Sequence, residues 1–182
     1  MGSGTTLVEA KLLNRNAIGI DINLQSVLIS ETNLKFQCES NSKVYMKNGT
    51  ATDLSMIKDG SIDFICTHPP YANIIKYSHS IDGDISLLRG DEFIDSMKLV
   101  AKESYRVLKK GKMCAVMIGD MRKNGKVIPL GFRVMECFLQ VGFSSKEIII
   151  KEQHNCRSTE YWENQENSFL LLAHEYIFVF QK

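Results

Sequence analysis

Long apolar runs are missing from this chain of 182 residues, and none approaches the ~20 residues that a membrane-spanning helix needs. The first residues also lack the basic-then-apolar order of a secretory signal peptide, so we expect a soluble, cytoplasmic protein. A strong charge imbalance is absent too, because the formal net charge is only +1. The chain therefore lacks the overall basic excess of many nucleic-acid binders, although a local basic patch would be enough to bind one.

Cysteine pairs at metal-binding spacing are also missing. The five cysteines are spread along the chain with no C-x-x-C pair. Three of them fall in apolar strand or helix patterns, where a free cysteine packs as a small hydrophobe. We therefore predict reduced core residues rather than disulfides or metal ligands. His154 and Cys156 lie close together, but zinc needs further ligands at suitable spacing and none is evident, so no metal site is predicted.

Proline is scarce, and two of the three prolines stand together at Pro69 and Pro70. They end the apolar segment 61–68, which is typical of a buried strand, and Tyr71 follows at once. Proline fixes φ and has no backbone donor, so it cannot continue a strand inside a sheet. The sequence therefore predicts a rigid turn at the carboxyl end of this strand.

Elsewhere the apolar spacing alternates between the strand period and the helix period. Helices are predicted over 5–15, 24–38, 91–110 and 129–141. Strands are predicted over 17–21, 43–49, 61–68, 112–120, 146–153 and 175–181. This alternation indicates an α/β fold with a mostly parallel sheet and helices on both faces. The last two strands have no helix between them, so we expect an antiparallel last strand, all within one domain, 1–182.

Ligands of such sheets bind at the carboxyl ends of the strands. The polar segments that follow the predicted strands are 21–23, 49–53, 67–71 and 119–122. Candidate functional residues fall in each of these segments, which places the predicted site at one edge of the sheet.

The glycine-rich start has two interpretations: a loop that binds a ligand, or an ordinary capped start of a helix. Gly2 and Gly4 stand directly ahead of a helix, where a backbone can approach a ligand and N–H groups are unpaired. No Lys-Ser/Thr pair follows, so this is not a Walker motif. Asp21 ends the next strand roughly 17 residues later, near the spacing at which an acidic residue holds a ribose hydroxyl. Asp53, after the following strand, could meet an adenine amino group, so the set indicates a nucleoside-containing cofactor.

Four segments together resemble the amino-group DNA methyltransferases, the adenine-N6 and cytosine-N4 family that uses S-adenosylmethionine. They are MGSGTTLVEAKLLNRNAIGIDIN (1–23), THPPY (67–71), YRVLKKGKMCAVMIGDMRKNGKVIPLGFRVMECFLQVGF (105–143) and FLLLAHEYIFVF (169–180). The resemblance covers nearly the whole chain, and its motifs are specific in combination. It implies the Rossmann-like fold of these enzymes, with S-adenosylmethionine as cofactor and DNA as partner. The cofactor-binding residues that it implies are Gly2, Ser3, Gly4, Thr5, Asp21, Ile22 and Asp53.

The resemblance also implies that His68, Pro69, Pro70 and Tyr71 form the catalytic tetrapeptide. An exocyclic amine on a heteroaromatic ring is a poor nucleophile, because its lone pair is delocalised. Acceptors at the amine hydrogens, here His68 and the Pro69 carbonyl, favour the nitrogen geometry that attacks a methyl group. Tyr71 would stack on a base that has left the duplex.

His68 departs from the family pattern, which usually has Asp, Asn or Ser at this position. A neutral imidazole can accept a hydrogen bond through one nitrogen, whereas a protonated one cannot. The departure leaves the target base open. A plain surface histidine at the end of a strand is the alternative interpretation.

The start of the chain is a second departure. Family members place an apolar strand directly before the glycines, near the middle of the sheet, and this chain begins at the loop. The neighbouring strands would then expose ladder groups that need partners. We therefore expect the C-terminal portion of a longer or two-chain enzyme. An N-terminal segment, a second chain or a rearranged strand of its own would complete the sheet.

Nucleic-acid contacts are expected from two polar segments. Arg122 and Lys123 follow a strand end beside the predicted site, where phosphate contact is favoured. Arg157 and Trp162 are the candidates in the unassigned stretch 153–168. Two further functions stay open: an RNA guanine-N2 methyltransferase, and an inactive subunit that binds the cofactor.

Overall fold

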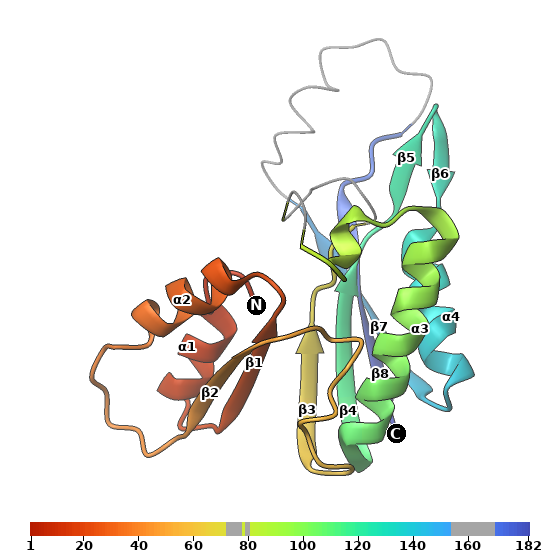
Figure 1. Cartoon of the computed structure of the whole chain (residues 1–182). Helices are drawn as coiled ribbons and strands as arrows, with labels where there is room; N and C mark the ends of the chain where they lie inside the picture. Colours follow the sequence, from red (N-terminus) through yellow and green to blue (C-terminus); the bar gives the residue numbers. More distant parts are fainter. Residues whose placement is uncertain (72–77, 79–80, 154–169) are drawn as a thin grey trace.

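The computed structural model describes residues 1–71, 78, 81–153 and 170–182. In this part of the chain the strands form a two-stranded sheet, a four-stranded sheet and a two-stranded hairpin. The helices and strands alternate as expected for an α/β fold (Figure 1).

The N-terminal unit, residues 1–48, contains the two-stranded sheet. Its elements are α1 (Thr5–Leu12), β1 (Ala17–Asp21), α2 (Leu24–Asn33) and β2 (Val44–Asn48). β1 and β2 run parallel, with Asp21 opposite Asn48 at their carboxyl ends. Leu7 of α1 is buried and packs over Gly19, where a side chain would collide with it. The predicted helix over 24–38 ends early, at Asn33, and the carbonyls of Leu34 and Phe36 beyond it accept hydrogen bonds from the Lys11 ammonium.

The main sheet has the strand order β3-β4-β8-β7. Its strands are β3 (Ile62–Thr67), β4 (Leu108–Ile118), β7 (Ser144–Glu152) and β8 (His174–Gln181). β3 and β4 are parallel, and β8 is antiparallel to both β4 and β7. β7 therefore runs in the direction of β4, and the predicted antiparallel last strand is confirmed.

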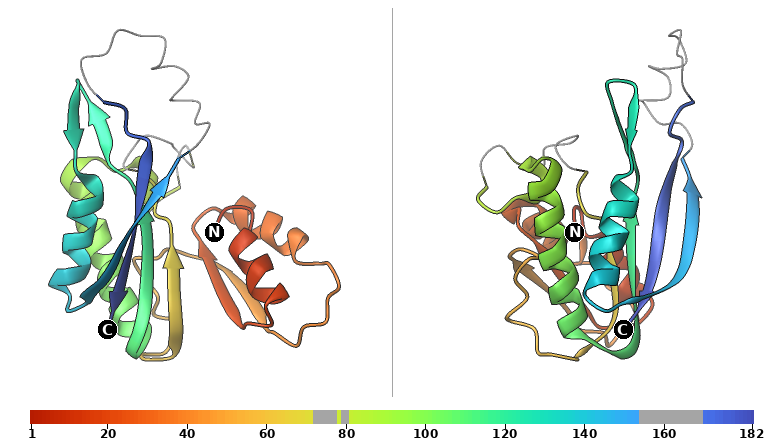
Figure 2. Two further views of the ribbon diagram at one scale, coloured as in Figure 1. Left: turned by 180° about the vertical axis from the view of Figure 1, so that it is seen from behind. Right: turned by 90° about the vertical axis from the view of Figure 1, so that its right-hand side faces the viewer.

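The core lies between the main sheet and two helices, α3 (Gly90–Val107) and α4 (Leu130–Gln140). Both helices cover the same face of this sheet (Figure 2). Strands β4 and β8 turn alternate residues toward them, as the two-residue period of a strand requires. Phe178 and Phe180 of β8 are fully buried there.

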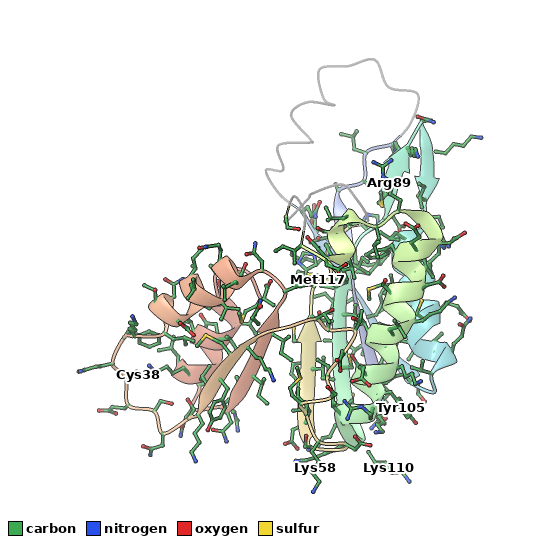
Figure 3. The ribbon with its side chains drawn as sticks, viewed as in Figure 1. Cys38, Lys58, Arg89, Tyr105, Lys110 and Met117 are labelled. Carbon is green, nitrogen blue, oxygen red and sulfur yellow. The ribbon has the colours of Figure 1, made fainter. Side chains whose placement is uncertain are left out.

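The helix predicted over 91–110 is shorter than expected, because α3 gives way to β4 at Leu108 without a turn. Gly111 has a φ of 77°, so this glycine permits an irregularity inside β4 and does not end a helix. Lys109 pairs with Asp63 of β3 at 2.7 Å, which fixes the start of β4 alongside β3. Lys58 and Lys110 lie at this amino end of the sheet, opposite the carboxyl end where the candidate site is expected (Figure 3).

The hairpin of β5 (Met121–Lys123) and β6 (Lys126–Ile128) was missed by the sequence analysis. Its turn residues Asn124 and Gly125 both have positive φ, 52° and 74°. Such pairs favour a turn whose twist matches that of the strands. The hairpin projects beyond the end of the main sheet (Figure 1).

The strand expected between the two sheets is not present in the described residues. There, β1 pairs with β2 alone and β3 with β4 alone. Ile18 on β1 and Phe64 on β3 are 47% and 57% exposed. A rearranged strand of the chain's own is therefore not found within the ranges described. The expectation of an N-terminal segment or a second chain stays a prediction.

Candidate functional site

The carboxylate of Asp21 lies against the glycine-rich loop at the end of β1. Its Oδ2 accepts hydrogen bonds from the Met1 ammonium at 2.8 Å and from the Gly2 N–H at 3.1 Å. Its Oδ1 accepts from the Asn23 N–H at 2.9 Å. Burial raises the pKa of Asp21, but these donors outweigh it and the pKa is lowered overall. The loop and Asp21 are therefore in contact, and their shared role in cofactor binding stays a prediction.

Gly4 has a structural reason to be glycine. Its φ of 84° is left-handed, and a Cβ there would lie 2.7 Å from the side chain of Ser30 on α2. Ser30 is fully buried and donates to the Gly2 carbonyl, while Asn33 donates to the Ser3 carbonyl. The loop is therefore fastened to α2, and α1 begins at Thr5 with no side-chain cap.

Asp53 and Ile22 occupy loops near this end of the sheets. Asp53 is exposed and accepts a hydrogen bond from the Ser55 N–H at 2.9 Å, the main cause of its lowered pKa. Ile22 is half-buried, and its Cδ1 would lie 3.5 Å from a Cβ at Gly83. Asp53 thus keeps a charged side chain in solvent, where a ligand can reach it.

The turn His68-Pro69-Pro70-Tyr71 begins directly after β3 ends at Thr67. Pro69 is buried, whereas the His68 side chain is 44% exposed. The rings of His68 and Tyr71 meet edge to face, with centroids 5.8 Å apart. The predicted rigid turn therefore exists at the predicted strand end and presents a histidine to solvent.

Glu175 on β8 fastens this turn, and sequence reasoning missed it. Glu175 is 5% exposed, and its Oε1 accepts a short hydrogen bond from the Tyr71 hydroxyl. Its Oε2 accepts from Lys151 of β7 at 2.7 Å. Burial opposes ionisation, but hydrogen bonds from Lys151, Tyr71 and Gln153 lower the pKa of Glu175 to about 2. The carboxylate is therefore charged at neutral pH.

His68 lies against the same carboxylate, with its Nε2 3.5 Å from Oε1 of Glu175. The pKa of His68 is lowered, first by burial and then by the charges of Lys151 and the N-terminal ammonium, although Glu175 raises it. The imidazole is therefore neutral at pH 7. The glycine loop contacts Asp21 at the carboxyl end of β1, and the turn follows the carboxyl end of β3.

Gly119, just after β4, makes room for this arrangement. A Cβ at Gly119 would lie 3.1 Å from the Tyr71 hydroxyl and 3.5 Å from Cγ of Glu175. Asp120 next to it has a structural role, because it accepts from the Gly131 N–H at the start of α4 and from the Tyr176 hydroxyl of β8. The signal for Glu175 was one carboxylate inside the apolar stretch HEYIFVF.

The predicted nucleic-acid contacts lie on the hairpin or outside the described residues. Lys123 is exposed at the end of β5. Arg122 donates to the carbonyls of Gly125 and Leu170, each at 2.8 Å, so its guanidinium fastens the hairpin to the segment before β8. Arg157 and Trp162 lie outside the described residues.

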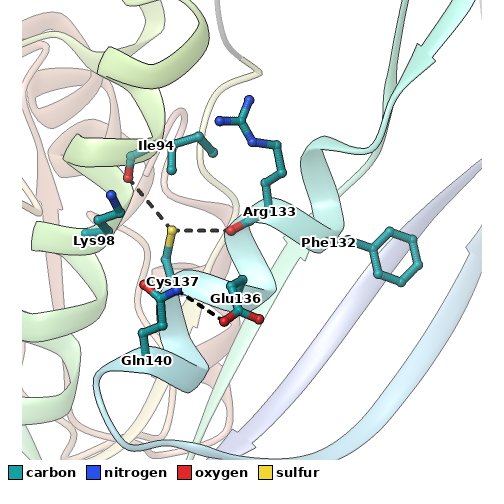
Figure 4. Close-up of a pocket in the computed structure, with 7 residues that line it drawn as sticks. All are labelled: Ile94, Lys98, Phe132, Arg133, Glu136, Cys137 and Gln140. Atoms are coloured by element: carbon teal, nitrogen blue, oxygen red, sulfur yellow. Dashed lines mark hydrogen bonds between the residues drawn. The ribbon is translucent and has the colours of Figure 1, made fainter.

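A shallow depression of about 310 Å³ lies between α3 and α4, away from the turn (Figure 4). Cys137 at its floor is 2% exposed and donates from Sγ to the carbonyls of Ile94 and Arg133. Burial raises the pKa of this thiol, so it is a packed side chain and not a nucleophile.

The described residues contain no group of three or more His, Cys, Asp or Glu side chains that could hold a metal ion. Within the same ranges, no helix has both the length and the apolar character needed to cross a membrane.

Comparison with solved structures defines the class of fold. A SAM-dependent methyltransferase from Methanosarcina mazei superposes with a TM-score of 0.66 at 16% identity, over 100% of this chain and 88% of that chain. In the main sheet of this chain β3, β4 and β7 run in one direction and β8 is reversed. The chain therefore has the Rossmann-like fold of the S-adenosylmethionine-dependent methyltransferases.

The particular family follows from the sequence. The model of the DNA methylase family matches residues 1–32 and 62–182, so the chain belongs to that family. Type II methyltransferase M.MthZI of Methanothermobacter thermautotrophicus is 26% identical over 159 residues, 77% of this chain and 44% of the relative. Type II methyltransferase M.MjaVI of Methanocaldococcus jannaschii is 30% identical over 118 residues, 64% of this chain and 56% of the relative. The chain thus spans about half the length of these relatives, and the predicted family is confirmed.

Proposed function

We propose that residues 1–182 form a methyltransferase catalytic domain that transfers a methyl group from S-adenosylmethionine to the exocyclic amino group of a DNA base, adenine N6 or cytosine N4. The observation that carries this proposal is the turn 68–71, held by the buried Glu175 at the carboxyl end of β3. Membership of the DNA methylase family supports DNA as the substrate.

The glycine loop and Asp21 fit one end of the cofactor. A carboxylate offers about four acceptor positions. Three donors already use Asp21, so Oδ1 keeps one position for a ribose hydroxyl. We propose that Gly2, Ser3, Gly4 and Thr5 line the methionine end, with Ile22 and Asp53 near the adenine. The cofactor supplies a methyl group made electrophilic by its sulfonium.

The turn supplies acceptors for the base. His68 is neutral at pH 7 and half exposed, so one imidazole nitrogen can accept a hydrogen of the amino group. The Pro69 carbonyl is the second acceptor in this proposal, and the two prolines keep both rigid. Tyr71 stacks on the flipped base, and its hydroxyl is held by Glu175 so that the ring cannot turn away.

The β5–β6 hairpin is proposed to contact the DNA backbone. Lys123 and Lys126 face each other directly in its ladder, and like charges in that arrangement are destabilising without a counter-charge. A phosphate between them would remove the repulsion. Arg122 fastens the hairpin, while Arg157 and Trp162 remain proposed contacts.

The test is methyl transfer from labelled S-adenosylmethionine to duplex DNA and, separately, to tRNA, with mass spectrometry of the nucleosides. We expect N6-methyladenine or N4-methylcytosine in the DNA. Transfer to tRNA guanine alone would favour the RNA enzyme. Cofactor binding by calorimetry with no transfer to either substrate would favour the inactive subunit.

Tyr71→Ala and Tyr71→Phe form a matched pair for this assay. Stacking on a base contributes about 1–3 kcal/mol, so Tyr71→Ala should lower transfer roughly five- to hundredfold at unchanged cofactor affinity. Tyr71→Phe keeps the ring and should retain more activity. Full activity of Tyr71→Ala would contradict a base-stacking role.

A further inference from the structure

The buried carboxylate of Glu175 contacts His68 as well as the residues that neutralise its charge. A charge that is 5% exposed is costly unless it is paired. The carboxylate already accepts hydrogen bonds from Tyr71, Lys151 and Gln153, so His68 is not needed to pair it. The imidazole of His68 nevertheless lies 3.5 Å from the same Oε1 atom. A carboxylate at this distance favours the tautomer that carries its proton on the nitrogen facing it, and a hydrogen bond formed on closer approach would fix the ring orientation.

We propose that Glu175 is a positioning residue for His68: its carboxylate keeps the imidazole proton on Nε2, so that Nδ1 is the acceptor available to the amino group of the target base. This inference rests on the proposed function. In the described part of the chain no hydrogen bond occupies Nδ1 of His68, and the side chain is 44% exposed, so a base can reach it. With Glu175 beside it, His68 presents one acceptor atom at the position where the family usually has Asp, Asn or Ser.

The arrangement also balances the protons of the reaction. The base nitrogen bonds to the methyl carbon as the carbon–sulfur bond of the cofactor breaks, and the methylated nitrogen then sheds one proton. Nδ1 of His68 takes that proton. The sulfonium has become a neutral thioether, and the positive charge ends on an imidazolium that is paired with the Glu175 carboxylate. The proton passes to solvent from the exposed side of the ring.

The charged groups around His68 decide the pH dependence. Glu175 of β8 raises its pKa, whereas Lys151 of β7 and the Met1 ammonium lower it, and Tyr71 contributes its ring edge. Removing the carboxylate should therefore lower the pKa of His68, and removing Lys151 should raise it. Any charge this close to His68 would move its pKa, so the tautomer of the ring is the measurement that separates positioning from packing.

The first experiment compares Glu175→Gln with the wild type across pH, measuring methyl transfer to DNA and the titration of His68 by NMR of protein labelled with ¹⁵N-histidine. We expect transfer at pH 7.5 to fall roughly tenfold or more with cofactor affinity unchanged, and the acid limb to move to lower pH. In the wild type the nitrogen shifts should report a proton on Nε2. Glu147→Gln, an exposed change on β7, is the matched control and should alter none of these.

Lys151→Met keeps the proposal testable if Glu175→Gln does not fold. It should move the His68 titration and the acid limb to higher pH. In a His68→Asn background, which restores a family residue, Glu175→Gln should cost less activity than it does beside His68, because Asn has no tautomer to fix and only the contact with Tyr71 is affected.

Unchanged His68 titration in both Glu175→Gln and Lys151→Met, or a wild-type proton on Nδ1, would overturn the proposal. The failure of the proposed function looks different. A wild type that methylates no DNA would leave the NMR titration and tautomer intact as tests of the Glu175–His68 pair.

Discussion

The N-terminal unit and the main sheet differ in how they bury apolar side chains. The main sheet with α3 and α4 has a continuous core that includes Phe93, Phe138, Phe178 and Phe180, all fully buried. Among residues 1–48, which are all described, the buried apolar side chains are Leu7 and Val27. Seven large apolar side chains of that unit are exposed: Leu12, Leu13, Ile18, Leu24, Leu28, Ile29 and Tyr45.

The part of the molecule with the larger packed core is therefore not the part that holds the proposed cofactor-binding residues. The main sheet carries the turn 68–71 on a packed core, whereas the glycine loop and Asp21 belong to a unit with little core of its own. Exposed apolar surface of this extent is typical of a surface that contacts another segment or chain. The partner expected for the open strand edges would cover the same unit.

The largest effect should come from the core of the main sheet. Phe178→Ala removes a fully buried ring and should cost about 3–5 kcal/mol of unfolding free energy, measured by urea denaturation. Phe132→Ala on α4, where the ring is 44% exposed, is the control and should cost clearly less. Equal losses for the two variants would mean that the core is not where the structure places it.

Acid should affect the main sheet through Glu175. Its pKa in the folded protein is about 2, below the ordinary 4.5. Its ionisation therefore stabilises the fold fully above pH 4.5, and the contribution, on the order of 3 kcal/mol, is lost as the pH falls from 4.5 toward 2. Urea midpoints between pH 2 and 6 should fall more steeply for the wild type than for Glu175→Gln. Parallel curves would show that the carboxylate is not specially stabilised.

The N-terminal unit should respond in cofactor affinity. Asp21→Asn removes a charged acceptor worth about 1.5–3 kcal/mol, so calorimetry should show S-adenosylmethionine binding weakened roughly ten- to hundredfold. Asp63→Asn on β3 makes the same chemical change away from the loop and should bind as the wild type does. An unchanged dissociation constant for Asp21→Asn would remove Asp21 from the cofactor site.

The smallest effect is expected from Tyr45→Ala. The Tyr45 side chain is 61% exposed, and substitutions at such positions usually alter stability by less than about 0.5 kcal/mol. A loss above about 1 kcal/mol in thermal or urea denaturation would show that another segment or chain covers this part of the N-terminal unit. That result would indicate that the N-terminal unit is covered by the predicted partner and is not exposed as the main sheet's surface is.

Local sequence signals predicted where several candidate site residues lie in the fold. Asp21 ends β1 and the turn 68–71 follows β3, and the paired prolines gave a local signal for the end of β3 because proline cannot continue a central strand. The Asn124-Gly125 pair carried an equally local signal for the β5–β6 hairpin, and the sequence analysis passed over it.

Glu175 could not be found in the same way. Its partner Tyr71 is 104 residues away, and no local pattern reports which buried carboxylate meets which hydroxyl. The boundary between α3 and β4 was missed for a related reason. Helical periodicity continues past Val107, but pairing with β3 imposes an extended backbone from Leu108.

The position of β8 sets the order in which the molecule can be assembled. β8 is the last strand in the described chain, yet it lies between β4 and β7, both of which leave the ribosome before it. Until it enters that slot, Tyr71 has no Glu175 to hold it. An unfinished chain would therefore carry the proline turn but no buried carboxylate behind it. Only a chain synthesised through β8 could assemble the complete turn.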